Sequence, residues 1–204
     1  MHLRRRWNIL WGHQHLERVT FGGYETLAQL YGGRPYFHLG YVAELLNILD
    51  DTKGQIFLVR HTSFGDVEKA LWFHELFRNP KRQDNEEQSA QCASMLMRLM
   101  NRPVPEIVRV KSLILAAKQK RLQFEPDHQL LHDLTLVKFA QAADEYDDMA
   151  NSIRKENKYL LDIHYAGRRL YDLETLMRRE YLYHLPIFRK RYEAQARANI
   201  VREM

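Results

Sequence analysis

The 204-residue chain has few of the residues that mark several protein classes. Its one cysteine, Cys92, cannot form an internal disulfide or gather four thiolates around a zinc ion. Six prolines and nine glycines are too few for a long disordered or collagen-like tract. The longest apolar runs, 56–59 and 113–117, are far shorter than the roughly 20 residues that cross a bilayer. These absences predict an ordered intracellular or organellar protein with no membrane span.

Charge is plentiful but mixed in sign. Thirty-one Lys and Arg against 26 Asp and Glu give a net charge of +5, and 45% of the residues are hydrophobic, enough for one sizeable core. Most of the positive excess lies in residues 168–204. Because acidic residues are interleaved with the basic ones, this charge permits an acidic partner without requiring one.

The spacing of apolar residues predicts an all-α fold, a single globular helical domain over residues 1–204. An N-terminal helix within 1–20 either packs on this domain or extends to a partner. Only 55–61 has strand character, and it reads equally well as a loop. The later segments with helical periodicity are 66–78, 85–101, 106–120, 127–142, 144–160, 164–182 and 187–203.

The first helix carries Arg4, Arg5 and Arg6 beside an apolar stripe that includes Trp7 and Trp11. An arginine-rich start with no acidic residue resembles a mitochondrial targeting helix, but such leaders are usually rich in serine. We therefore favour a first helix of the domain, with the targeting interpretation left open.

Paired glycines predict the next boundaries. Gly22-Gly23 and Gly32-Gly33 are expected to bracket a short helix, because paired glycines end helices and begin turns. Pro35 suits the first turn of a following helix over 35–49. Phe37 and Tyr41 would then share one face of that helix.

One group of residues could carry chemistry. A helical His74 beside Glu75, joined by a distant Asp133, could present nitrogen and oxygen ligands to a divalent metal. Plainer explanations compete. His74 can be a hydrogen-bonded helix residue, and the acidic residues Asp84 and Glu87 that follow can be a helix N-cap and its capping-box partner.

At these residues the chain resembles uncharacterised bacterial proteins of the HD superfamily of predicted metal-dependent phosphohydrolases. The resemblance runs nearly end to end and rests on motifs in the family's order: Arg34-Pro35-Tyr36-Phe37-His38-Leu39-Gly40-Tyr41-Val42, Leu71-Trp72-Phe73-His74-Glu75, Asp84-Asn85-Glu86-Glu87-Gln88-Ser89-Ala90, Ala116-Ala117-Lys118-Gln119-Lys120, Asp133-Leu134, Ile153-Arg154-Lys155-Glu156 and Ala196-Arg197-Ala198-Asn199. It implies an HD-like helical bundle.

The departures from the family pattern imply a degenerate metal site. Phe37 and Tyr41 stand where the family has two histidines four residues apart, and Lys120 stands at a later family histidine. Neither an aromatic ring nor an ammonium supplies the nitrogen lone pair that a metal takes from imidazole. Only His74, Glu75 and Asp133 remain as possible ligands. The degenerate site therefore implies that no cofactor is bound. If the site is still active, these three residues would hold a divalent metal.

Three functions follow as hypotheses. The favoured one is a structural or interaction subunit of a larger assembly in the mitochondrial matrix or cytoplasm, with other protein subunits as partners. The alternative is an active phosphohydrolase for a nucleotide-like phosphate ester, in which Arg34 or Lys120 neutralises the oxyanion.

A third hypothesis is RNA binding by the C-terminal helices. Arginines such as Arg168, Arg178 and Arg191 alternate there with Tyr171 and Tyr181, and arginine with aromatics can clamp phosphates and stack on bases. Amphipathic helices with solvated or paired arginines are the plainer explanation.

Overall fold

The computed structural model describes residues 2–12, 17–55, 62–116 and 125–204, with the backbone alone for 17–21. Within these ranges the chain is 75% helical, with ten α-helices and no strand, which confirms the all-α prediction. None of the described helices is long and apolar enough to cross a membrane. The chain divides into two compact units, residues 1–131 and 132–204.

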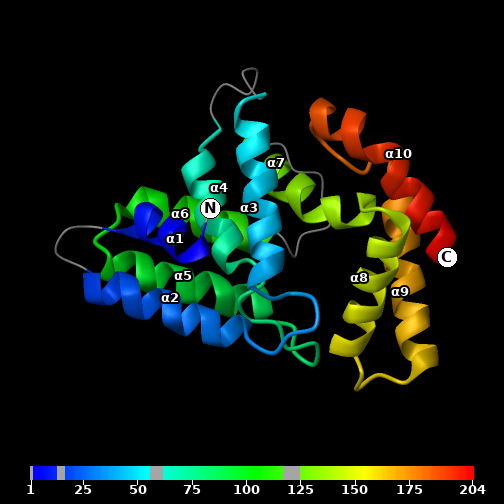
Figure 1. Ribbon diagram of the computed structural model, residues 1–204, viewed down its shortest axis with the longest axis horizontal. Coiled ribbons are helices and arrows are strands. Elements are labelled where there is room, and N and C mark those ends of the chain that lie inside the picture. The colour runs from blue at the N-terminus through cyan, green and yellow to red at the C-terminus, as the bar shows by residue number, and fades with distance from the viewer. Residues whose placement is uncertain (1, 13–16, 56–61, 117–124) are drawn as a thin grey trace. The chain divides into compact units, whose positions relative to one another are not determined.

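Unit 1 is built around a central helix, α4, which packs on α3, α5 and α6. Every residue of α4 from Asp66 to Phe73 is buried, as expected for a helix covered on all sides. The helices of this unit are α1 (Leu3–Trp11), α2 (Glu17–Tyr31), α3 (Leu39–Lys53), α4 (Phe64–Phe73), α5 (Asn85–Leu99), α6 (Val104–Ala116) and most of α7 (Pro126–Leu136) (Figure 1).

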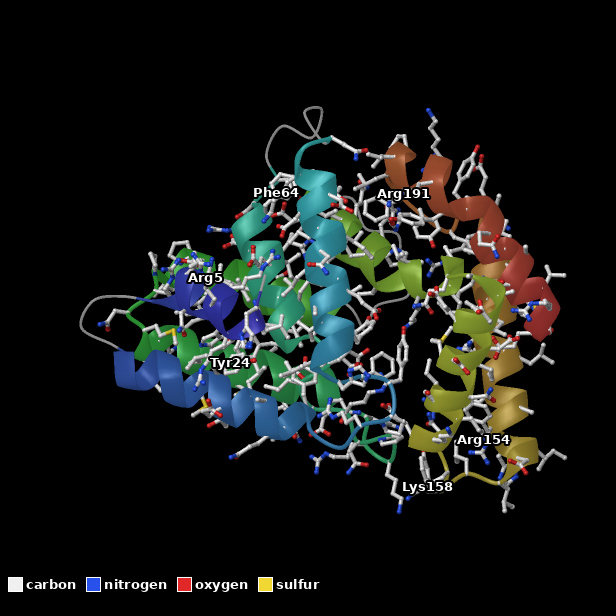
Figure 2. All side chains as sticks on the ribbon, in the orientation of Figure 1. Arg5, Tyr24, Phe64, Arg154, Lys158 and Arg191 are labelled. Atoms are coloured by element: carbon white, nitrogen blue, oxygen red, sulfur yellow. The ribbon has the colours of Figure 1, made fainter. Side chains whose placement is uncertain are left out.

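A cluster of aromatic side chains packs α1 against α4. Trp7 meets Trp72 edge to face at 5.3 Å between ring centroids, and Trp11 meets Phe73 at 5.9 Å. Tyr24 of α2 lies 6.2 Å from Trp7, between ring centroids (Figure 2). Because such rings bury large apolar areas in preferred geometries, α1 forms part of the core of unit 1.

Ion pairs made by buried cations also link the helices of unit 1. Arg6 of α1 donates to Glu68 of α4 at 2.7 Å and to Asp50 of α3 at 3.0 Å. Lys69 of α4 pairs with Glu106 of α6 at 3.1 Å. A buried charge is tolerated only when it is paired in this way, so these contacts fix which helix faces meet.

Two predicted boundaries in unit 1 are wrong. Gly22 and Gly23 lie inside α2, which runs through them, and only Gly32-Gly33 follow its end. Pro35 lies outside any helix, because α3 begins at Leu39 after an N-cap at His38, whose ring accepts from the amide of Gly40. The N-cap bond satisfies an amide that the helix itself leaves unpaired, and this sets the start of α3. The uncertain segment at 55–61 lies almost entirely outside the described residues.

Unit 2 contains the end of α7, a 3₁₀ turn η1 (Val137–Ala140), α8 (Ala143–Glu156), α9 (Asp162–Met177) and α10 (Pro186–Glu203). The buried side chain of Asn199 in α10 donates to the carbonyls of Phe139 and Gln141, both at 2.9 Å. Glu203 near the end of α10 pairs with Arg169 of α9 at 2.7 Å. These contacts hold α10 against η1 and α9.

Candidate functional site

His74 lies at the C-terminal end of α4 with its ring buried. Its Nδ1 is 2.9 Å from the carbonyl of Leu71. A carbonyl only accepts, so Nδ1 carries the proton and Nε2 keeps the lone pair. The hydroxyl of Tyr41 lies 3.5 Å from that Nε2. Both ring nitrogens of His74 therefore face protein groups.

The ring of Tyr41 packs beside His74, and the ring of Phe37 packs on Tyr41. Their rings meet edge to face at 5.2 Å between centroids, and the Tyr41 ring lies 5.8 Å from the His74 ring. The predicted contact between the pair is present, but the predicted helical face is wrong: Phe37 precedes α3 and only Tyr41 belongs to it. The guanidinium of Arg78 lies 3.7 Å from the centroid of the Phe37 ring.

Arg34 binds the backbone at the end of α4. Its guanidinium donates to the carbonyl of Glu75 at 2.6 Å and to that of Leu76. Glu75 and Leu76 lie in the turn just after α4, close to the negative pole of that helix, so a cation is favourable there. Glu75 itself accepts from Arg78 at 2.7 Å. Arg34 and Glu75, both site candidates, thus form contacts within the protein.

Asp133 is fully buried in unit 2 and accepts two backbone hydrogen bonds. Its Oδ1 accepts from the amide of His184 at 2.8 Å, and its Oδ2 accepts from the amide of Leu185 at 2.7 Å. Leu185 is the N-cap of α10, so this carboxylate sits at the positive end of that helix. Asp133 belongs to unit 2, whereas His74 and Glu75 belong to unit 1. Lys120, the remaining candidate, lies outside the described residues.

Asp84 does not form the capping box suggested by the sequence. It occupies the N-cap position of α5 but makes no side-chain capping bond. Its carboxylate instead accepts from Arg82 at 2.7 Å and from Gln88 at 2.9 Å. The neighbouring Asn85 bonds both the amide and the carbonyl of Asn79, each at 2.9 Å. This motif therefore braces the loop before α5.

The sequence analysis missed a cluster of His132, Asp133 and His184, whose ligand atoms lie within 4.8 Å of one another. The adjacent His132-Asp133 pair was its only sequence signal. Arg179 donates to Nε2 of His132 at 2.9 Å, so Nδ1 holds the proton and lies 3.4 Å from Asp133. Burial lowers the pKa of His184, and the nearby His132 lowers it further. The negative charge of Asp133 acts in the opposite direction and raises that pKa. These contacts make a hydrogen-bond network beside a guanidinium.

Of the arginines that suggested RNA binding, Arg168 and Arg178 are exposed, and Arg178 lies 3.5 Å from Glu174 of the same helix. Other C-terminal arginines make contacts within unit 2. Arg169 pairs with Glu203, and Arg189 donates to the carbonyls of Tyr183 and His184 at 2.7 and 2.9 Å. Arg197 pairs with Glu193 at 2.7 Å. Arg191, which Figure 2 labels on α10, stays exposed.

The groups around His74 do not fit a divalent cation. Its ring packs beside Tyr41, and the adjacent carboxylate of Glu75 already pairs with Arg78. A metal on His74 would therefore face a tyrosine hydroxyl and a carboxylate already paired with an arginine, in place of imidazole ligands. No family model, curated protein or solved structure matches this chain.

Proposed function

We propose that this chain is a catalytically degenerate relative of the HD phosphohydrolases and acts as a structural subunit of a larger assembly. One observation carries the proposal: the polar side chains of the candidate site bind the protein itself. Arg34 donates hydrogen bonds to backbone carbonyls, and the ring of His74 faces the Leu71 carbonyl and the Tyr41 hydroxyl. The carboxylate of Glu75 accepts a hydrogen bond from Arg78. Groups that are held in this way stabilise a fold and are poorly placed to bind substrate.

The other motif residues support the same proposal. The Asp133 carboxylate accepts hydrogen bonds from the backbone amides just before α10. The Asn85 side chain forms hydrogen bonds with the loop before α5, and that of Asn199 donates from α10 to a carbonyl of η1. Residues of the family pattern that remain in this chain thus have structural contacts, whereas Phe37 and Tyr41 fill the positions of the lost histidines. The phosphohydrolase alternative would need Arg34 and Glu75 released from these contacts.

The assembly would lie in the mitochondrial matrix or the cytoplasm. The arginine-rich start that suggested mitochondria is also a structural helix, since Arg6 is buried against Asp50 and Glu68. The proposal therefore draws its support from the contacts of the candidate site rather than from this segment.

The metal content of the purified full chain tests the loss of catalysis. Protein prepared without chelator is challenged with manganese, iron, nickel and magnesium, beside His74→Ala and His184→Ala. We expect no stoichiometric metal in any of the three, because both ring nitrogens of His74 and of His132 already face hydrogen-bond partners. About one metal per chain, lost in either variant, would overturn the degenerate assignment and place the metal in the unit of that variant.

The native mass of the chain tests the assembly. Epitope-tagged protein in extracts of its own cells should migrate far above the 24.5 kDa of one chain, together with other subunits in constant ratio. Migration at the mass of a free monomer at all extract concentrations would contradict the proposal.

A further inference from the structure

An apolar groove runs between α2 and α5, which lie side by side in Figure 1. Its volume is about 740 Å³, and its walls include Leu27 and Leu30 from α2 and Leu96 and Leu99 from α5. None of the fourteen lining residues carries an acidic or basic side chain, in a chain with 28% charged residues. The groove is therefore complementary to an uncharged, apolar surface.

The polar groups of the groove are largely engaged. The hydroxyl of Thr26 donates to the carbonyl of Gly22 at 2.9 Å, and the amide of Gln88 donates to Asp84 at 2.9 Å. Burial raises the pKa of the Cys92 thiol, so this side chain stays neutral at physiological pH. Recognition would therefore rest on apolar contact and shape rather than on directed hydrogen bonds.

The shape of the groove suits a helix. Its α2 wall extends from Gly22 to Leu30, nine residues that span about 12 Å along the helix axis. Gly22 faces open space, since an added Cβ there would meet no atom within 4 Å. On the α5 wall, Met95 and Leu99 are 57% and 61% exposed and form an apolar rim. A helix laid along the groove would cover both walls and this rim.

A matching apolar stripe lies on α9 of unit 2. Ile163, Leu170 and Tyr171 are 77%, 41% and 61% exposed, and their spacing puts them on one face with Gly167 between them. Among the residues of α9 only Leu173 is buried. The stripe spans residues 163–171, again about 12 Å.

We propose that the α9 stripe of one copy of this chain docks in the α2–α5 groove of a second copy. One contact would then bury both exposed apolar features, which match in length and in their lack of charge. The contact joins two different surfaces, so it builds a ring if it closes and a filament if it does not. This proposal goes beyond the structural role proposed above, since it names self-association as the way in which the chain assembles.

Two complementary variants of the full chain test the contact. Leu99→Lys puts a charge into the groove and leaves α9 intact, whereas Leu170→Lys puts a charge into the stripe and leaves the groove intact. The controls Val104→Lys and Val108→Lys change valines of α6 that are 71% and 59% exposed and lie outside the groove lining. Mass is measured by light scattering over about 1 to 200 µM, a range in which mass action reveals weak association.

We expect the wild type and both α6 controls to form oligomers whose average mass rises with concentration, up to a fixed size if the contacts close a ring and without a limit if they form a filament. Each groove or stripe variant alone should weaken association at least about tenfold, because a lysine would be buried without a partner. Mixed together, the two variants should form dimers that do not grow further, since the mixture retains one intact groove and one intact stripe. The association should also survive about 1 M NaCl, since no charge lies in the contact.

Three results would overturn the proposal. A wild type that stays monomeric throughout the concentration range excludes the second copy as the occupant. Oligomers that persist in both lysine variants place self-association elsewhere on the chain. Oligomers of unchanged size in the mixture, or their loss in the Val104 control, show that the groove and stripe are not the two halves of one contact. Circular dichroism of each variant checks that the helices are retained.

Discussion

The hydroxyl of Tyr41 lies 3.5 Å from Nε2 of His74, and both side chains are buried. Burial raises the pKa of Tyr41 well above its usual value, and the nearby Tyr36 and Glu75 raise it further. Tyr41 is therefore a neutral donor facing the one lone pair that His74 retains. This relationship makes His74 a hydrogen-bonded core residue.

The first prediction concerns that pair. His74→Ala should lower the free energy of unfolding by about 2–3 kcal/mol, because it removes a buried ring and its bond to the Leu71 carbonyl. Tyr41→Phe should cost only about 0.5–1 kcal/mol, since it removes one long hydrogen bond and keeps the ring. Urea unfolding at neutral pH measures both values. The exposed Tyr171→Phe is the control, and a His74→Ala variant as stable as wild type would contradict the structural role.

The second prediction concerns Arg34. Arg34→Met should destabilise the protein by about 1.5–3 kcal/mol, because the carbonyls of Glu75 and Leu76 lose a charged donor at a helix end. Arg34→Lys should recover only a small part of this, since an ammonium lacks the planar fork that reaches both carbonyls. Urea unfolding with the exposed Arg5→Met as control tests the idea. Full recovery by lysine would show that charge alone matters.

How far the sequence predicts this molecule depends on the range of the interactions. Helix content follows from local periodicity and is predicted correctly. The boundaries at Gly22-Gly23 and Pro35 are not, because tertiary packing outweighs local propensity there: α2 continues through its glycines, one of which lies against Trp7 and Leu96. The start of α3 depends on the side chain of His38, which composition does not reveal.

In the candidate site, too, the sequence predicts some features and not others. The residue types at His74, Glu75 and Phe37 are visible in the sequence, and the contact of Phe37 with Tyr41 was expected from core packing. The partners of Arg34 and Asp133 were not, since each bonds backbone atoms more than 40 residues away, where no side-chain pattern marks the acceptor or donor. Backbone partners of this kind leave no trace in a single sequence.

The third prediction isolates the role of Asp133. Asp133→Asn keeps one carbonyl oxygen and puts an NH₂ group where the second amide needs an acceptor, at a cost of about 1–3 kcal/mol. The amides of His184 and Leu185 should then exchange with solvent faster, which nuclear magnetic resonance can follow residue by residue. Asp148→Asn on the exposed side of α8 is the control. Unchanged protection of both amides would show that the carboxylate does not hold the start of α10.

The fourth prediction is a pH dependence from Glu106. Burial disfavours its charge, but hydrogen bonds from Arg102 and Lys69 outweigh burial and lower the pKa below the ordinary 4.5. A carboxyl with a lowered pKa stabilises the fold above its unfolded pKa, and this stabilisation is lost as pH falls through the folded value. Glu106→Gln should therefore cost about 3 kcal/mol at pH 7, because Lys69 loses a buried partner.

Acid titration of the unfolding free energy checks the sign of this effect. The difference between wild type and Glu106→Gln should be constant above about pH 5 and should shrink as the pH falls below about 4.5. Glu145→Gln, at an exposed position of α8, should leave the profile of the wild type unchanged. A difference that grows on acidification would mean that the folded pKa is raised instead.

The fifth prediction uses the adjacent glycines of α2 as a matched pair. Both lie within the helix, so alanine gains about 0.8–1 kcal/mol of helix propensity at either position. At Gly22 the new methyl group meets no atom within 4 Å, and the protein should become more stable by nearly that amount. At Gly23 the methyl group would lie 3.3 Å from both Leu96 and the buried Trp7. Crowding should offset the gain there and leave Gly23→Ala at least about 1 kcal/mol less stable than Gly22→Ala. Thermal and urea unfolding of the two variants measure this difference, and equal stabilities would mean that α2 does not approach α1 and α5 as closely as the structure places it.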